Sequence, residues 1–291
     1  MPTDESVLAI CVNWNGGEIL RQTVDSLLHS NYPGLEVLVV DNASTDDSLS
    51  LLPEAAGIVK LDTNLGYGGA INAVLRRYLR SDSPTYFLLL NNDVIVAEDT
   101  LSSLIEFARD KGSGVFGPRI VQFEDTSRLE AAWGKVSWSH VLARYEGKNA
   151  SKTHGQWLQT RKVELLLGSA LLVHRQILED VGLFDEDFFM YHEEVDYLFR
   201  ARRLGFPVYF CPFAEVIHRG AHSTRDQPLK KVFWIRRNAI YFLRKHHATV
   251  SQWVYFWTSL ALSFLYNGLT LKWSRAATIW RAVREGLTHK C

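Results

Sequence analysis

Three side chains at separate places in this 291-residue chain could together serve group transfer from an activated, phosphorylated donor. Asp93 ends an apolar, strand-like run, and His218 follows another. A carboxylate and an imidazole at strand ends could hold a divalent cation that stabilises a diphosphate leaving group. Glu194 lies in an acidic segment with Glu193 and Asp196, where a carboxylate could take a proton from an acceptor hydroxyl.

Each of these residues also has a more ordinary interpretation. An acid after a strand can cap a turn, and a lone histidine after a strand is more often structural. Acids at the start of a helix are favoured by the helix dipole alone. The metal site therefore depends on whether the fold brings Asp93 and His218 together.

The elements that must position these residues follow an alternating pattern. Short apolar runs predict strands at 7–14, 35–44, 57–62 and 85–93, and helical spacing predicts helices at 18–30, 64–79 and 98–110. This alternation predicts an α/β fold whose mostly parallel sheet is flanked by helices. Ligands bind at the carboxyl ends of such strands, where Asn13, Asp41, Asn64 and Asp93 fall.

The later part of the chain is less regular. We expect residues 112–165 to form a β insertion that faces a second substrate. Residues 163–175 predict a strand interrupted at Gly168 and Ser169, residues 193–205 a helix, and residues 207–212 a strand. The glycine-rich segment 64–69 matches neither the dinucleotide fingerprint nor a P-loop, which disfavours a P-loop kinase or ATPase.

Composition and charge indicate an ordinary globular protein with a distinct tail. Hydrophobic residues make up 47% of the chain and charged residues 22%, with zero formal net charge. Residues 230–291 carry +10, however, and residues 1–229 carry −10. This asymmetry predicts an anionic partner surface for the tail.

Cysteine usage and the N-terminus indicate where the protein works. Cys11, Cys211 and Cys291 are few, odd in number and without CxxC spacing, which disfavours a disulfide scaffold and structural zinc. The N-terminal segment lacks the basic start and apolar core of a signal peptide, so we expect a cytoplasmic protein.

The tail predicts amphipathic helices. Residues 246–271 contain no Asp, Glu, Lys or Arg, which is long enough for a membrane span, but several polar residues fall near one helical stripe. Residues 272–287 combine tryptophans with lysine and arginine. We expect helices that lie in a membrane interface. Packing on the catalytic domain or on a second subunit, and a true span, stay as alternatives.

Several sequence blocks together resemble a known family. VNWNGGEIL, VVDNASTDDS, NLGYGGAIN, FLLLNNDVIV, GSALLVHR, VGLFDEDFFMYHEEVDYLFRARRLGF and AEVIHRGAHS occur in one order, followed by RRN at 236–238. They resemble family 2 glycosyltransferases with a GT-A fold, particularly the bacterial rhamnosyltransferase-like branch. The resemblance implies a Rossmann-like GT-A catalytic domain over residues 1–228 and a helical tail over 229–291.

The resemblance also implies residue roles in an inverting sugar transfer. Glu194 matches the catalytic base, and Asp93 and His218 match the ligands of Mg²⁺ or Mn²⁺. The residues expected to bind the nucleotide-sugar are Asn13, Asn15, Asp41, Asn42, Asn64, Gly66, Gly69, Asn91, Asn92, Gly168 and Ser169. Two positions depart from the family pattern: Glu stands at the base position, where Asp is common, and Asn91 replaces the first acid of the family's DxD motif.

The implied substrates are a nucleotide diphosphate-sugar and a hydroxyl of a glycan or polyprenyl-diphosphate-linked acceptor in cell-envelope polysaccharide synthesis. The expected donor is dTDP-L-rhamnose, with a UDP-sugar (galactose, galactofuranose or N-acetylhexosamine) as the alternative. We expect peripheral association with the inner face of the cell membrane and no nucleic-acid partner; a homo-oligomer stays open.

Two rival functions remain to be weighed. A nucleotidyltransferase would need a basic glycine-rich loop, and residues 15–18 contain no Lys or Arg. A catalytically degenerate glycan-binding scaffold is disfavoured by the presence of Asp93, Glu194 and His218.

Overall fold

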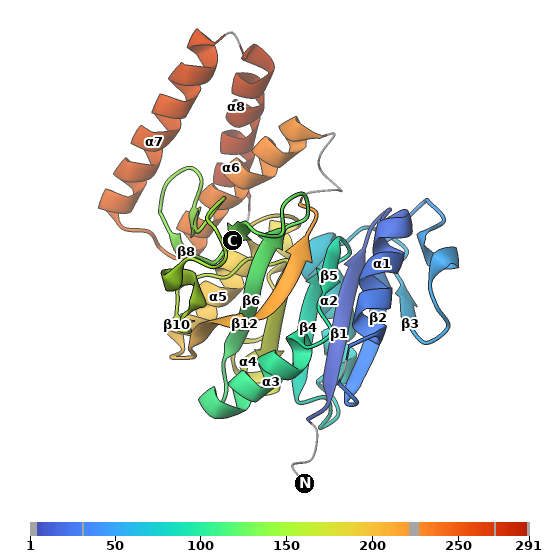
Figure 1. Cartoon of the computed structure of the whole chain (residues 1–291). Coiled ribbons are helices and arrows are strands. Elements are labelled where there is room, and N and C mark those ends of the chain that lie inside the picture. The colour runs from blue at the N-terminus through green and yellow to red at the C-terminus, as the bar shows by residue number, and fades with distance from the viewer. Residues whose placement is uncertain (1–4, 31, 221–226, 271, 290–291) are drawn as a thin grey trace.

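A mixed ten-stranded sheet forms the centre of the molecule (Figure 1). The computed structural model describes residues 5–30, 32–220, 227–270 and 272–289. The strands of the sheet are β1 (Val7–Asn13), β2 (Leu35–Asp41), β3 (Gly57–Lys60), β4 (Tyr86–Asn91), β5 (Val94–Val96), β6 (Val115–Gln122), β7 (Leu129–Ala131), β10 (Arg161–Lys162), β11 (Ala170–His174) and β12 (Val208–His218). The main strand order is β10-β12-β6-β11-β4-β1-β2-β3, with β5 paired to β12 and β7 to β6.

The N-terminal half of the sheet is parallel and buried on both faces. β1 pairs in parallel with β2 and β4, and every residue of β1 is buried. Strands of this kind read as continuous apolar runs because helices cover both sides. The α/β fold class and the four strands predicted in this half are confirmed.

Helices divide between the two faces of the sheet. Buried residues of α1 (Gly17–Leu28) and α3 (Thr100–Lys111) pack on one face. Buried residues of α2 (Gly66–Tyr78), α4 (Arg175–Val181) and α5 (Glu193–Arg203) pack on the other. The apolar layers on the two faces hold the strands in place, and with them the polar residues at the strand ends.

The segment predicted as an insertion is only partly one. β6 joins the central sheet, where it pairs with β11 and β12. β7 and β10 also pair with strands of this sheet. Only β8 (Trp133–Val136) and β9 (Ala143–Glu146) form a separate hairpin. The strand predicted over 163–175 is shorter than expected, because Leu165 pairs with Gly134 of the hairpin and only β11 enters the sheet.

Three helices complete the chain. α6 (Pro228–Lys245) is largely buried against the α/β body and against α8 (Trp273–Thr288). α7 (Val250–Leu269) and α8 project from the body as a hairpin (Figure 1). A search of the described residues finds no helix with the length and hydropathy needed to traverse a bilayer.

Candidate active site

A cavity of about 630 Å³ opens at the carboxyl ends of the parallel strands. Most of the residues predicted from the sequence line it: Asn42, Asn64, Gly66, Asn91, Asn92, Asp93, Gly168, Ser169, Glu194 and His218. Asn13, Asn15, Asp41 and Gly69 are not part of its lining. The fold therefore brings residues as far apart in the sequence as Asn42 and His218 to the same cavity.

Asp93 and His218 are brought together by strand register. β5 pairs with β12 so that His218 lies opposite Val94, the residue after Asp93. As a result the Nε2 atom of His218 lies 3.1 Å from Oδ1 of Asp93, and both side chains are buried. The fold thus brings Asp93 and His218 together, as a shared metal site requires.

A second acidic residue, Glu130 of β7, lies beside His218. Its Oε2 atom lies 2.7 Å from Nδ1 of His218. Burial lowers the pKa of His218, but hydrogen bonds and charge from Asp93 and Glu130 outweigh burial and raise it to about 10. A carboxylate on Nδ1 fixes the ring orientation and directs Nε2 towards Asp93, as is usual for a metal-ligating histidine.

The donor set suits a divalent cation that shares its coordination with substrate. Mg²⁺ and Mn²⁺ sites beside phosphates use few protein ligands, and one carboxylate with one imidazole is compatible with them. Within the part of the chain that the structure describes, no three His, Cys, Asp or Glu side chains form a group that could hold a metal by themselves.

Glu194 lies at the start of α5 and faces the same cavity. The hydroxyl of Tyr145, from β9, donates a hydrogen bond of 3.2 Å to Oε1 of Glu194. Gly168 lies directly against the Glu194 side chain, because a Cβ at position 168 would lie 3.1 Å from its Cγ. The carboxylate is therefore held from two sides.

Glu193 and Glu194 influence each other's protonation. Burial and the neighbouring charge of Glu194 hold the pKa of Glu193 well above its usual range. Burial also raises the pKa of Glu194, against hydrogen bonds from backbone groups and Tyr145 that lower it. Two adjacent carboxyl groups do not ionise together easily, so we assign the proton to Glu193 and the negative charge to Glu194.

Asp196, the third acid of this segment, has a structural role. It is fully buried and pairs with Arg200, Lys245 and His246. Burial raises its pKa, but these hydrogen bonds and charges outweigh burial and lower it to about 2. Asp196 thus anchors the end of α6 to α5.

Polar residues at and just after the ends of β1 and β2 form the floor beneath the cavity. Asn13 donates to Oδ1 of Asp41 at 3.0 Å and accepts from Asn92 at 2.9 Å. Asn42 donates to Oδ1 of Asn64 and to the carbonyl of Gly66, both at 3.1 Å. Asn13, Asn15 and Asp41 are thereby occupied in holding loops, while Asn42 and Asn64 also reach the cavity surface.

The loop before α5 has an unusual backbone. Phe189, Tyr191 and His192 all have positive φ, a region that non-glycine residues rarely adopt. The buried carboxamide of Asn238, on α6, donates to the carbonyls of Phe188, Met190 and Tyr191 at 2.7–2.8 Å. These hydrogen bonds hold the loop in the conformation that starts α5 with Glu193 and Glu194.

Gly66 allows this loop to approach the start of α2. Its φ is +74°, and a Cβ there would lie 2.0 Å from the carbonyl oxygen of Phe189. The backbone N–H of Tyr67 donates to the same oxygen at 3.0 Å. Only glycine fits this approach.

Sequence reasoning missed several residues of the lining. Glu130, Tyr145 and Lys148 come from the irregular segment after β6, and Lys231 and Ile235 come from α6. The sequence places no motif on the first three, and the helical pattern of α6 gives no sign that it reaches the cavity. For α6, the one signal in the sequence was the RRN triplet at 236–238, which directly follows Ile235. Its asparagine, Asn238, holds the loop before α5.

Comparison with known proteins decides the family. The family model for Glycosyl transferase family 2 matches residues 6–182, more than half of the chain. The chain belongs to this family. A Mycobacterium tuberculosis N-acetylglucosaminyl-diphospho-decaprenol L-rhamnosyltransferase is 28% identical to this family 2 glycosyltransferase, over 82% of the chain and 84% of that relative. The Escherichia coli K12 rhamnosyltransferase WbbL is 22% identical, over 82% of the chain and 93% of the relative.

Comparison with solved structures also finds a glycosyltransferase of similar fold. The mannosyltransferase PcManGT from Pyrobaculum calidifontis, solved in complex with GDP-Man and Mn²⁺, superposes with a TM-score of 0.56 at 18% identity. The match covers 100% of the chain and 89% of that structure. The predicted GT-A architecture and the likeness to rhamnosyltransferases of family 2 are confirmed.

Proposed function

We propose that this glycosyltransferase is metal-dependent and inverting, and that it transfers L-rhamnose from dTDP-L-rhamnose to a hydroxyl of a lipid-linked glycan. The observation that carries the proposal is the convergence of the Asp93–His218 pair and Glu194 on one cavity. The names of the two rhamnosyltransferase relatives support the sugar, and the decaprenol-linked substrate named for one of them supports the acceptor.

In the proposed reaction, Glu194 accepts the proton of the acceptor hydroxyl. The acceptor oxygen attacks the anomeric carbon as the bond from that carbon to the diphosphate breaks, which inverts the configuration and releases the nucleoside diphosphate. A raised pKa makes Glu194 a stronger base than an exposed glutamate. Tyr145 orients the carboxylate, and Lys148 and Lys231 contribute positive charge at the cavity.

Asp93 and His218 would hold Mg²⁺ or Mn²⁺, and the cation would supply positive charge against the negative charge of the leaving diphosphate. Glu130 would act through His218 by accepting its Nδ1–H. Asn42 and Asn64 would border the nucleotide, above a floor formed by Asn13, Asn15 and Asp41. Gly168 and Ser169 would border the sugar, whereas Gly69 lies within α2, where a Cβ would come 2.8 Å from the Cβ of Leu65.

A polyprenyl-linked acceptor resides in a membrane, so we propose that the protein works peripherally on the cytoplasmic face of the cell membrane. The supporting observation is the charge of +10 carried by residues 230–291.

The test is a transfer assay with dTDP-L-rhamnose and, separately, UDP-sugars on a polyprenyl-diphosphate N-acetylglucosamine acceptor, with Mn²⁺ and with chelator. We expect transfer from dTDP-L-rhamnose and not from the UDP-sugars, and we expect chelator to abolish it. NMR of the product should show an inverted anomeric configuration. Transfer from a UDP-sugar instead would overturn the donor assignment, and a retained configuration would overturn the role of Glu194. Absence of transfer and of donor hydrolysis, in a folded sample, would favour a glycan-binding scaffold.

A further inference from the structure

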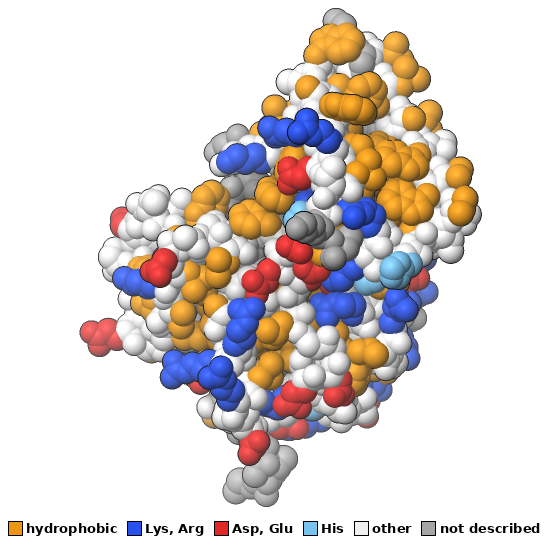
Figure 2. Space-filling model, turned by 180° about the vertical axis from the view of Figure 1, so that it is seen from behind, with side chains coloured by type: hydrophobic (Ala, Val, Ile, Leu, Met, Phe, Trp, Pro, Cys, Tyr) orange, Lys and Arg blue, Asp and Glu red, His pale blue; other side chains and the backbone are white. Residues whose placement is uncertain are grey.

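The outward side of α7 is an apolar surface. The helix is 20 residues long and contains no Asp, Glu, Lys or Arg. Val250, Val254, Leu265 and Leu269 recur along one stripe, and Val254 and Leu265 are 59% and 58% exposed. Figure 2 shows hydrophobic side chains gathered over this projecting part of the molecule. Contiguous exposed apolar surface of this kind marks an interaction site.

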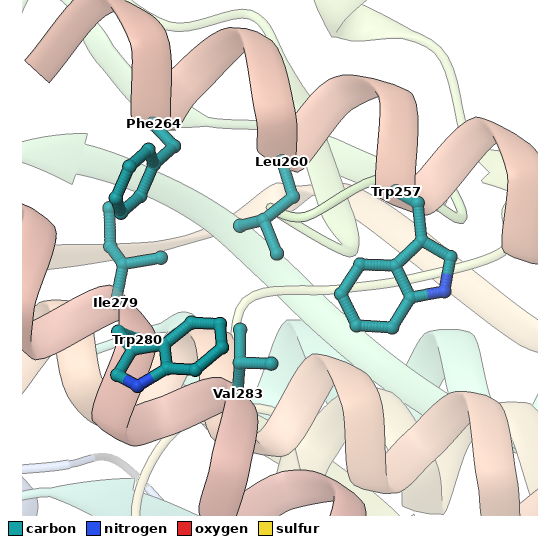
Figure 3. A pocket seen from close by; sticks show the side chains of 6 residues that line it. All are labelled: Trp257, Leu260, Phe264, Ile279, Trp280 and Val283. Atoms are coloured by element: carbon teal, nitrogen blue, oxygen red, sulfur yellow. The ribbon is translucent and has the colours of Figure 1, made fainter. Parts of the chain in front are cut away.

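An apolar groove lies between α7 and α8 next to this surface. Figure 3 shows side chains of both helices pointing into it, and the cavity measures about 200 Å³. Its lining consists of Trp257, Leu260, Phe264, Ile279, Trp280 and Val283, all of them apolar. Trp280 is 68% exposed at its edge. A groove with only apolar lining suits a hydrocarbon chain and offers no partner to a polar ligand.

Cationic side chains border the same hairpin. Lys272, Arg275, Arg281 and Arg284 are exposed on or beside α8, and Glu285 is the one acidic residue among the described residues of this hairpin. Lys272 lies over the ring of Tyr266, on α7. Tryptophan, aliphatic residues and cations on paired amphipathic helices match the interfacial zone of an anionic bilayer.

We propose that the α7–α8 hairpin docks on an anionic lipid bilayer, with the Val and Leu stripe of α7 inserted among the lipids and one lipid chain in the groove. Charge complementarity selects the bilayer over a second copy of this chain, because pairing two hairpins would bring their cations together.

Docking of the hairpin would also place the catalytic cavity near the bilayer. The backbone N–H of His140 donates to Oγ of Ser259, on α7, at 3.0 Å, and the next residue, Val141, lines the cavity. Ile235 of α6 lines it as well. That the acceptor comes from this bilayer rests on the proposed function, whereas vesicle binding by the hairpin does not.

The test is flotation of the full chain with vesicles of phosphatidylcholine alone and of phosphatidylcholine mixed with phosphatidylglycerol. We expect binding to the mixed vesicles, weaker binding at high salt, and a loss of about tenfold or more in Leu265→Glu. Phe213→Glu is the matched control, because Phe213 is 65% exposed on β12 of the catalytic body and should leave binding unchanged. Donor hydrolysis measured in parallel reports on the proposed function separately.

Three outcomes would overturn the proposal. Wild-type protein that stays unbound with mixed vesicles removes the bilayer as partner. Equal losses in Leu265→Glu and Phe213→Glu remove the hairpin as the docking surface. A wild-type dimer that Leu265→Glu converts to a monomer, without vesicle binding, assigns the surface to a second copy of the chain.

Brominated lipids test the groove itself. Bromine on the acyl chains quenches nearby indole fluorescence, and we expect wild-type quenching to drop clearly in Trp280→Phe while flotation is retained. Because Trp257 also lines the groove, quenching that is unchanged when both Trp257 and Trp280 are replaced by Phe would show that no lipid chain enters it.

Discussion

Glu194 and Glu193 are adjacent carboxyl groups with different expected roles. With the proton assigned to Glu193, glutamine at position 193 resembles the native side chain, whereas glutamine at 194 removes the proposed base. We predict that Glu194→Gln lowers the rate of transfer by about 10²–10⁴-fold with nucleotide binding retained, and that Glu193→Gln lowers it by less than about tenfold. Steady-state kinetics and calorimetry on the two variants measure this. The opposite ranking would move the base to Glu193.

The pKa of His218 predicts how metal binding depends on pH. A cation can bind Nε2 only after His218 loses its proton, and Asp93 and Glu130 raise the pKa of this group to about 10. Below that pH, metal affinity should increase with pH by about tenfold per unit, with one proton released per ion bound. Calorimetry of Mn²⁺ binding in buffers of different ionisation enthalpy measures the proton count.

Removal of Glu130 provides the matching variant. In Glu130→Gln the positive charge of His218 loses one of its two carboxylate partners, so the pH dependence should shift to lower pH. After the smaller proton competition in the variant is accounted for, loss of the orienting partner should weaken the intrinsic Mn²⁺ affinity of the neutral imidazole by about 10–100-fold. Identical proton release and affinity in this variant and in wild type would contradict the role of Glu130.

Among the elements, α6 is the part of the helical tail that holds the loop before α5. Asn238 supplies both of its amide hydrogens to three carbonyls of residues whose neighbours have positive φ. We predict that Asn238→Asp lowers kcat by about tenfold or more while the Kd of the nucleotide changes less than about twofold, because a carboxylate cannot donate to these carbonyls. The Asn238 amide donates to the loop carbonyls and not to Asn42 or Asn64, the residues proposed to border the nucleotide.

Asn267→Asp is the control for this prediction. Asn267 is also a buried helical asparagine, but it donates to a single carbonyl within α7, away from the cavity. It should leave kcat unchanged. Equal loss of kcat and nucleotide affinity in Asn238→Asp, together with a lowered Tm, would indicate general unfolding instead of a displaced loop.

The positions of the main strands could be predicted from the sequence, but the contacts between distant strands could not. Apolar runs located β1, β2 and β4, so the strand ends that carry Asn13, Asp41 and Asp93 were predictable. The contact between Asp93 and His218 depends on the register between β5 and β12, which local pattern does not encode. Glu130 and Tyr145 lie on short strands whose pairing is long-range, so no spacing in the sequence points to them.

At the scale of the whole molecule, the catalytic body and the hairpin should contribute separately to turnover. We predict that Leu265→Glu lowers transfer to a polyprenyl-linked acceptor in anionic vesicles by about tenfold, in proportion to lost vesicle binding, while hydrolysis of the donor in solution is unchanged. Parallel assays with and without vesicles measure the two rates. Equal loss of both activities would show that the hairpin supports the catalytic body and does not act by docking.

We propose that the cavity binds a nucleoside diphosphate through a cation held by Asp93 and His218. The most direct measurement is calorimetric titration of dTDP, with UDP and GDP for comparison, into wild-type protein and Asp93→Ala, each with and without Mn²⁺. We predict that Mn²⁺ strengthens dTDP binding to the wild type by about tenfold or more and has no effect on Asp93→Ala. Equal dTDP affinity with and without Mn²⁺ in the wild type, or an undiminished Mn²⁺ effect in Asp93→Ala, would contradict the account.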